Sequence, residues 1–236
     1  MNKIKKQRFT LIELLLVMGL MGLMVTLALP AFSRMAGNNK IDIMTSNIKT
    51  ALEQGQSTAV SRNCYVAVVF PLAAAEADVK DYNFGGYRLA EVKPTGTNGT
   101  DYTFVKWISE SYMNKPDGAY IVGSSTKKFS PDATDESTTH KKVPSEVKTG
   151  NFEKFEGIKG SVPDVDLTKC KAVIFKSTGE CVNSDMYICI ANADADTLKV
   201  SNMYDYRQLE LNQFTGRVDY VSDEDESSNN NTGGGK

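Results

Sequence analysis

Histidine is almost absent from this sequence: His140 is the only one among 236 residues. It lies in the polar stretch TTHKK, which offers no apolar wall to orient an imidazole beside a nucleophile. The sequence also lacks a P-loop, a dinucleotide-binding glycine fingerprint and an HExxH motif. We therefore predict that the protein is not an enzyme and that it binds no cofactor.

Cysteine is scarce as well, and no two cysteines have the CxxC spacing that zinc sites use. The acidic runs lack the spacing of a calcium loop, so no metal site is predicted. Cys170, Cys181 and Cys189 lie close together in a predicted hairpin, whereas Cys64 stands apart. Two alternatives stay open. The three late cysteines form a disulfide in an oxidising compartment, or they are buried free thiols that pack as small apolar side chains.

The net charge is small, at −2. It disfavours a nucleic-acid partner, because the chain has no excess of positive charge that could neutralise a run of phosphates. Positive charge is nevertheless concentrated at the N-terminus. The first eight residues hold no acid and four cations: Lys3, Lys5, Lys6 and Arg8. Because basic flanks of a membrane span stay on the cytoplasmic side, this asymmetry predicts a cytoplasmic N-terminus with the body across the membrane.

A long apolar run follows these cations. Residues 14–29 carry no charge and would span about 24 Å as a helix. Extension to Leu11 and Phe32 reaches the ~30 Å of a hydrocarbon core. Three interpretations compete: a cleaved secretory signal peptide, a plain membrane anchor, and a span in which Glu13 has a definite partner. No A-x-A cleavage site follows the run, and an acid in a plain span costs on the order of a few kcal/mol, so the third is preferred.

The segment RFTLIELLLVMGLMGLMVTLALPAF resembles the N-terminal signal of type IV pilins and of the pseudopilins of type II secretion. The resemblance implies a basic leader, residues 1–8, which prepilin peptidase removes by cutting between Arg8 and Phe9. N-methylation of Phe9 follows in that family. The family has glycine before the cut, and Arg8 stands there in this sequence. Pro30 falls where the family has its helix-breaking proline.

The same resemblance implies that Glu13, Gly22 and Pro30 serve assembly. In the family, the acid pairs with the terminal amine of a neighbouring subunit as helices stack into a filament. An acid that faces a cation is much less costly in lipid than an isolated one. From their chemistry alone, Gly22 and Gly19 would permit close packing of helices or a local weak point, or they reflect the ordinary tolerance of membrane helices for glycine. Pro30, which has no N–H to donate, would let the helix stretch when it is pulled.

A second helical pattern follows Pro30. Apolar residues at spacings of three and four predict an amphipathic helix that ends near Arg62 and packs on a sheet of the same chain: Ile41, Met44, Ile48, Ala51, Leu52, Gly55 and Ala59. Runs of β-branched and aromatic residues predict strands over residues 64–70, 86–92, 102–107, 119–122, 172–176, 186–190, 206–211 and 217–221. The triplet FTG predicts the turn of the last hairpin.

A long helix followed only by strands predicts an α+β fold, with a long N-terminal helix packed against an antiparallel sheet domain. Three stretches, SRNCYVAVVF, AVIFKSTGECV and LELNQFTGRVDY, resemble the minor pseudopilins of the H type and their pilus-assembly counterparts. This resemblance covers the first 70 residues and roughly residues 171–220.

The predicted organisation is a leader over residues 1–8, a transmembrane helix over 9–32, an amphipathic helix over 33–62, a β-rich domain over 63–221 and a disordered acidic tail over 222–236. Residues 124–150 hold few large apolar side chains and predict an exposed, mobile insertion. The aromatic residues Tyr102, Phe104, Trp107 and Tyr112 suit one face of a sheet, and a sugar- or DNA-binding role for them stays open.

The resemblance predicts a minor pseudopilin of a type II secretion pseudopilus, anchored in the inner membrane with its body in the periplasm. Its expected partners are other pilins and pseudopilins, prepilin peptidase and the inner membrane, without nucleic acid. One alternative is a minor pilin of a type IV pilus used for adhesion, motility or DNA uptake. Another is a membrane-tethered periplasmic binding module that uses the aromatic face.

Overall fold

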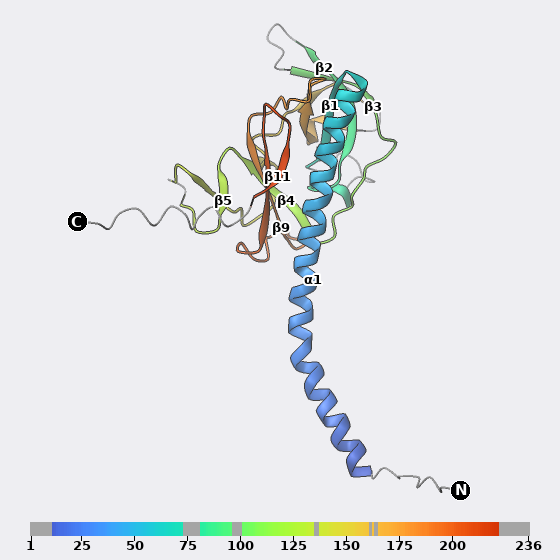
Figure 1. Cartoon of the computed structure of the whole chain (residues 1–236), viewed down its shortest axis with the longest axis vertical. Helices are drawn as coiled ribbons and strands as arrows, with labels where there is room; N and C mark the ends of the chain where they lie inside the picture. The colour runs from blue at the N-terminus through green and yellow to red at the C-terminus, as the bar shows by residue number, and fades with distance from the viewer. Residues whose placement is uncertain are drawn as a thin grey trace, which may run out of the picture. The chain divides into compact units, whose positions relative to one another are not determined.

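One helix begins the described chain: α1 runs from Leu11 to Arg62 without a break, over 52 residues (Figure 1). The computed structural model describes residues 11–72, 81–95, 101–134, 137–160, 162 and 165–221, and within α1 it leaves the side chains of residues 27–38 undescribed. The predicted leader, the cleavage site at Arg8 and Phe9, and the acidic tail lie outside the described residues. The chain forms two compact units, Met1–Asn39 and Lys40–Lys236.

The helix continues through Pro30, where the resemblance implied a break. Proline lacks the N–H that would bond to the carbonyl four residues earlier, so one helical hydrogen bond is missing at this point. Nearby, the Thr26 hydroxyl donates to the carbonyl of Leu23 at 2.8 Å, which satisfies a polar group in an otherwise apolar stretch. The loss of one backbone bond does not end α1.

In the second unit, α1 buries the stripe that the sequence predicts. Ile41, Ile48, Leu52 and Ala59 have no exposed surface, and Met44 is 3% exposed. Glu53, between them in sequence, is exposed. The prediction of an amphipathic helix that packs on the chain's own sheets is therefore confirmed.

A five-stranded sheet lies against this stripe, in the order β7-β3-β2-β1-β8. Its strands are β1 (Tyr65–Pro71), β2 (Arg88–Thr95), β3 (Asp101–Trp107), β7 (Ile158–Lys159) and β8 (Cys170–Phe175). The central pairs are antiparallel, with Val68 of β1 opposite Leu89 of β2 and Val173 of β8. The short edge strand β7 pairs with β3 in parallel.

A four-stranded antiparallel sheet has the order β11-β10-β9-β4. Its strands are β4 (Ala119–Ser125), β9 (Met186–Asn192), β10 (Tyr206–Leu211) and β11 (Val218–Tyr220). Strands β10 and β11 form the hairpin that the FTG triplet predicts, with Leu209 opposite Tyr220. A third, parallel pair joins β5 (Lys128–Ser130) and β6 (His140–Lys142). The eight predicted strands are confirmed, and β5, β6 and β7 were not predicted.

The core has two parts, one on each face of the five-stranded sheet. The larger cluster contains the buried stripe of α1, the alternate residues Val66, Val68 and Phe70 of β1, and the inner face of the four-stranded sheet. The smaller cluster contains Ala67 and Val69 of β1. This alternation follows from the period of two along a strand. The observed fold is thus α+β, as predicted.

Residues 124–150 are not the exposed insertion that the sequence predicts. Phe129, Val143 and Val147 are at most 2% exposed and belong to the larger core cluster. Gln208 of β10 fixes this segment, because its side-chain oxygen accepts from the Phe129 N–H at 2.6 Å and its amide donates to the Phe129 carbonyl at 2.9 Å. A few widely spaced apolar residues are enough to anchor a polar segment to the core.

Candidate assembly surface

Residues 11–26 expose apolar side chains around the whole circumference of α1. Every residue in this range is exposed. Representative exposed fractions are 80% for Leu11, 66% for Met18 and 57% for Val25. A helix that is apolar on all sides is a helix that lipid or other helices cover. This part of α1 is the candidate assembly surface.

Glu13 is the one charged residue in this surface. It lies in the first turn of α1, where the unsatisfied backbone N–H groups carry partial positive charge. A carboxylate is favourable at that end of a helix. The described part of α1 therefore carries one acid in its first turn, followed by an apolar surface.

Gly19 and Gly22 face open space within their own chain. A Cβ built on either residue would meet no atom within 4 Å. Glycine costs a helix roughly 0.5–1 kcal/mol relative to alanine, and no contact with the residues that the structure describes compensates for it. Close approach by the helix of another molecule would explain why both positions lack a side chain.

Within the described part of the chain, no helix combines the length and the apolar character that crossing a membrane requires. The predicted span over residues 9–32 lies only partly among the residues that the structure describes. Phe9 is outside it, and the side chain of Pro30 is not described.

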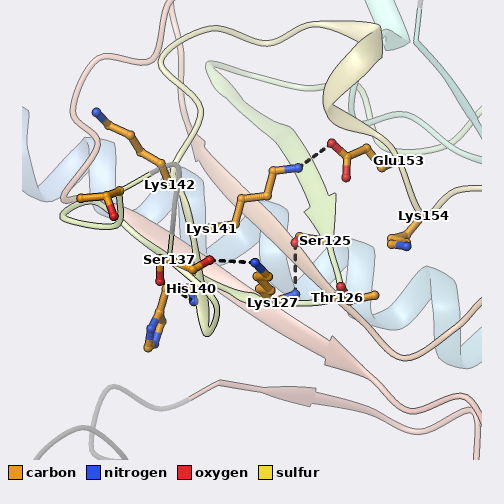
Figure 2. A pocket seen from close by; sticks show the side chains of 10 residues that line it. Ser125, Thr126, Lys127, Ser137, His140, Lys141, Lys142, Glu153 and Lys154 are labelled. Atoms are coloured by element: carbon orange, nitrogen blue, oxygen red, sulfur yellow. Dashed lines mark hydrogen bonds and ion pairs between the residues drawn. The ribbon is translucent and has the colours of Figure 1, made fainter.

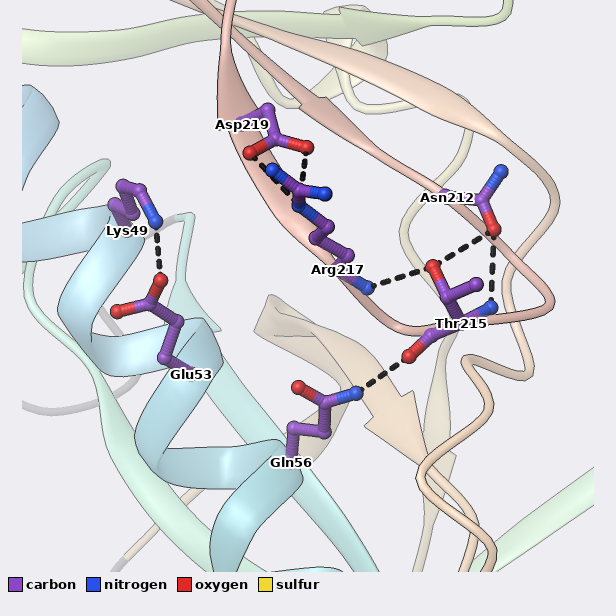
Figure 3. A network of polar contacts seen from close by, with 7 residues as sticks. All are labelled: Lys49, Glu53, Gln56, Asn212, Thr215, Arg217 and Asp219. Atoms are coloured by element: carbon purple, nitrogen blue, oxygen red, sulfur yellow. Dashed lines mark hydrogen bonds and ion pairs between the residues drawn. The ribbon is translucent and has the colours of Figure 1, made fainter.

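Gln56 connects the second half of α1 to two glycine turns that are far apart in sequence. Its amide donates to the carbonyl of Gly179 at 3.0 Å. It also donates to the carbonyl of Thr215 at 2.6 Å, the contact that Figure 3 shows. Gly216 adopts a φ of +64°, and a Cβ there would collide with the Gly179 carbonyl. The stretches AVIFKSTGECV and LELNQFTGRVDY therefore meet on the helix that precedes SRNCYVAVVF. Sequence analysis missed Gln56, although the FTG triplet predicted the second of the two turns.

Polar contacts also join the start of this helical half to the body. Asp42 accepts from Arg207 Nε at 2.8 Å, and Lys40 Nζ lies 3.2 Å from Asp117. Both pairs are exposed to solvent, so each contributes little to stability. These two pairs add specific contacts between the helix and the body, but packing of the apolar stripe contributes more to the stability of the attachment.

All four cysteines are free thiols. Cys170 belongs to the smaller core cluster, whereas Cys181 and Cys189 belong to the larger one, so a bridge from Cys170 to either would have to cross the sheet. Burial raises the pKa of the Cys181 thiol to about 12 and also raises the pKa of Cys189, so both stay protonated at neutral pH. The structure thus has the buried free thiols and not the disulfide among Cys170, Cys181 and Cys189.

The aromatic residues form packing contacts. Tyr102 is 4% exposed within the smaller core cluster, and Phe104 packs on Trp107 with ring centroids 4.9 Å apart. The guanidinium carbon of Arg88 lies 4.2 Å from the centre of the Trp107 ring and 5.8 Å from that of Tyr112. Arg88 therefore covers one face of the Trp107 ring.

The described residues hold no group of three or more His, Cys, Asp or Glu side chains placed to bind a metal ion. Asp194 instead closes its own turn, because its carboxylate accepts from the backbone and the hydroxyl of Thr197, both at 2.8 Å. These hydrogen bonds lower the pKa of Asp194. His140 is half-buried in β6, and its Nδ1 lies 2.9 Å from the Thr139 hydroxyl.

No model of a known protein family matches the sequence. No curated protein matches it either. Among solved structures, the minor pseudopilin EpsH from the type 2 secretion system of Vibrio cholerae is similar, with a TM-score of 0.35 and 10% sequence identity. The alignment covers 78% of this chain and 97% of that chain. A TM-score of this size does not assign the chain to a family.

Proposed function

We propose that the chain is a minor pseudopilin, a structural subunit that joins other pilins and pseudopilins in a type II secretion pseudopilus and helps export proteins across the outer membrane. One observation carries the proposal. Residues 11–26 of α1 expose apolar side chains on every side, whereas the apolar stripe from Ile41 to Ala59 of the same helix is buried in the body. A helix exposed in this way needs partners outside its own chain, and neighbouring subunit helices and lipid provide them.

Glu13 sets the register of stacking in this proposal. Cleavage between Arg8 and Phe9 gives a positively charged amine four residues before the carboxylate, and each Glu13 pairs with the amine of the next subunit. An acid in an apolar environment costs on the order of a few kcal/mol unless it pairs with a cation. The docked subunit is therefore favoured over the isolated one.

The proposal includes processing and location. Prepilin peptidase removes residues 1–8 and methylates Phe9, although arginine replaces glycine before the cut. The subunit is held in the inner membrane with its N-terminus in the cytoplasm and its body in the periplasm. Gly19 and Gly22 support this role because their open surface suits the close approach of a second helix. The role is structural, without catalysis.

A matched pair of variants on one helix tests the proposal. Glu13→Gln removes the charge at the leading end of α1, and Glu53→Gln removes the same charge from the exposed side of the second half, where Glu53 pairs with Lys49. We expect Glu13→Gln to reduce incorporation into sheared filaments at least tenfold, and Glu53→Gln to change it less than twofold. Immunoblots of filament and membrane fractions measure both.

Equal incorporation of Glu13→Gln and the wild type would overturn the stacking mechanism and favour a membrane-tethered binding module, which has no use for this acid. Mass spectrometry of the purified N-terminus tests processing separately. The proposal expects a methylated phenylalanine at position 9. An intact Met1 in assembled material would contradict it.

A further inference from the structure

The second half of α1 gives the body two ends, which we call the entry end and the exit end. At the entry end, where this half begins, Asp42 pairs with Arg207 at the start of β10. At the exit end, Gln56 donates to the carbonyl of Thr215, in the turn that follows β10. Strand β10 and the helix therefore run side by side from one end of the body to the other.

Positive charge gathers at the exit end, where α1 meets β2 and β3. Arg62 is the last residue of α1. Glu91 of β2 lies opposite Lys106 of β3, with its carboxylate 3.2 Å from Lys106 Nζ, and Lys93 follows on the same face of β2. Burial raises the pKa of the nearby Cys64 thiol, Glu91 raises it further, and Arg62 and Lys106 lower it, so these charges lie around one point. We call Arg62, Lys93 and Lys106 the exit patch.

The exit patch keeps positive charge that no described carboxylate neutralises. Arg62 and Lys93 are exposed and form no side-chain hydrogen bond or ion pair with a described residue. A further acid at this end, Asp185, accepts from the Gln213 N–H at 2.6 Å. Four other charges here form neutral pairs: Lys159 with Asp101 and Lys176 with Glu180.

Negative charge gathers at the entry end, in three acids that we call the entry patch: Asp117, Asp194 and Asp196. A backbone hydrogen bond of 3.0 Å from Ala193 to Gly118 holds the turn of Asp194 and Asp196 beside Asp117. The entry patch thus lies where β9 ends and β4 begins.

The same three acids act on Tyr120. Burial raises the pKa of Tyr120, and the charges of the three acids raise it further. Lys40, at the start of this half of α1, lies 3.2 Å from Asp117 and offsets one of them. Asp196 is exposed and forms no ion pair with a described residue, Lys199 included. The entry end therefore keeps negative charge.

The two patches are too far apart to neutralise each other within one chain. Lys40 and Arg62 are about 33 Å apart along α1, at roughly 1.5 Å per residue. The Debye length at physiological ionic strength is about 8 Å, so salt screens the attraction between the patches. Between two molecules, like ends repel and unlike ends attract.

We infer that the body binds a second copy of this chain end to end, with the exit patch of one molecule on the entry patch of the next. Exposed apolar side chains accompany both patches, with Val60 and Phe214 at the exit end and Ile43 at the entry end. Because the contact joins two different surfaces, it does not close, and it repeats in one direction. The inference deepens the proposed function and rests on it for its place in a filament.

Sedimentation velocity of the full chain in a nonionic detergent tests the inference, because detergent covers residues 11–26 and leaves the body free. We expect self-association that increases with protein concentration. Raising NaCl from about 50 to about 300 mM should weaken it several-fold.

A charge swap identifies the two ends. Arg62→Glu and Asp196→Lys should each weaken self-association at least tenfold, because each brings like charges together at the contact. An equimolar mixture of the two variants should regain self-association to within threefold of the wild type, because each new charge then meets the other. A variant that failed to fold could not be rescued in this way.

Lys142 of β6 provides the control. It is exposed and belongs to neither patch, and Figure 2 shows it on the opposite side of a pocket from Lys154. Lys142→Glu makes the same change of charge as Arg62→Glu and should change self-association less than twofold.

A mixture that stays dissociated, or equal effects of Lys142→Glu and Arg62→Glu, would overturn the inference. A wild-type chain that stays monomeric in detergent and still enters filaments would also overturn it, because a different subunit would then cover these ends. Rod stacking is measured separately by the incorporation of Glu13→Gln. A failed charge swap together with reduced incorporation of Glu13→Gln would reject the end-to-end contact and leave the proposed function in place.

Discussion

The two halves of α1 are both rich in apolar residues, yet their surroundings are opposite. Over residues 11–26 the apolar side chains point in every direction and all of them are exposed. Over residues 41–59 most of them recur at spacings of three and four, and this stripe is buried against two sheets, whereas Ile43, outside the stripe, is exposed. The arrangement of apolar residues around a helix, more than their number, decides whether they are buried within the same chain. A helix with one apolar stripe can bury that stripe against its own chain, whereas a helix that is apolar on all sides leaves apolar surface for other molecules to cover.

The largest expected effect comes from truncating one leucine in each half. Leu52 has no exposed surface and Leu16 is 62% exposed. Leu52→Ala should lower the free energy of unfolding by about 2–5 kcal/mol, since it leaves a cavity between helix and sheet. Leu16→Ala should change it by less than about 0.5 kcal/mol. Urea unfolding of the full chain in nonionic detergent, followed by the fluorescence of Trp107, measures both. Equal losses of unfolding free energy in the two variants would contradict the conclusion that only the second half of α1 is buried in its own chain.

A glycine pair should give a smaller effect. A Cβ on Gly55 would lie 2.5 Å from Val68 Cγ2 and 3.3 Å from the Phe175 ring, whereas one on Gly22 meets nothing within 4 Å. Gly55→Ala should destabilise the fold by about 1–3 kcal/mol because the core there is full. Gly22→Ala should leave the unfolding midpoint unchanged or slightly raised, since alanine favours helix. A stabilised Gly55→Ala variant would show that this interface has spare room.

Removing the Gln56 amide should have a still smaller effect. Gln56→Ala loses two hydrogen bonds to the turns at Gly179 and Thr215, which together contribute about 1–2 kcal/mol. Gln54→Ala is the control, because Gln54 is exposed on the same helix, and it should stay within about 0.5 kcal/mol of the wild type. The same urea titrations distinguish the two. Indistinguishable variants would mean that packing alone holds the turns.

The smallest effect is expected at the exposed pair of Asp42 and Arg207, whose side chains are 55% and 40% exposed. Asp42→Asn should cost about 0.2–1 kcal/mol at low ionic strength and almost nothing in 1 M NaCl, where such pairs are screened. Unfolding at both salt concentrations provides the measurement. A loss that persists in 1 M NaCl would show that the contact acts through its hydrogen-bond geometry.

The sequence predicted the elements whose periodicity is strong. The stripe from Ile41 to Ala59 and eight of the strands were found from spacing and residue type alone. The short strands β5, β6 and β7 were missed because two or three residues are too few to show a periodic pattern. Their pairing depends on partners elsewhere in the chain. The burial of residues 124–150 was missed for the same reason, since Phe129 and Val147 are separated by a largely polar segment.

The candidate sites differ in the same way. The assembly surface is continuous in sequence, so its apolar run and Glu13 could be recognised without a structure. The contacts of Gln56 join two distant turns to the helix, and no local pattern connects Gln56 with Gly179 or Thr215. The absence of a bridge from Cys170 depends on the face of the sheet to which each thiol points, and this is set by strand register, which spacing between cysteines does not reveal.

The contact between Gln56 and Thr215 has a consequence for biosynthesis. The two residues are 159 positions apart, so the ribosome adds the last hairpin long after the helix has emerged. At ordinary translation speeds of about 5–20 residues per second, the delay is roughly 8–30 s. Throughout that interval the helix stripe can pack on β1 and β2, which have already emerged, but the four-stranded sheet that completes its cover is still unfinished. The complete core can therefore form only after the last hairpin has left the ribosome.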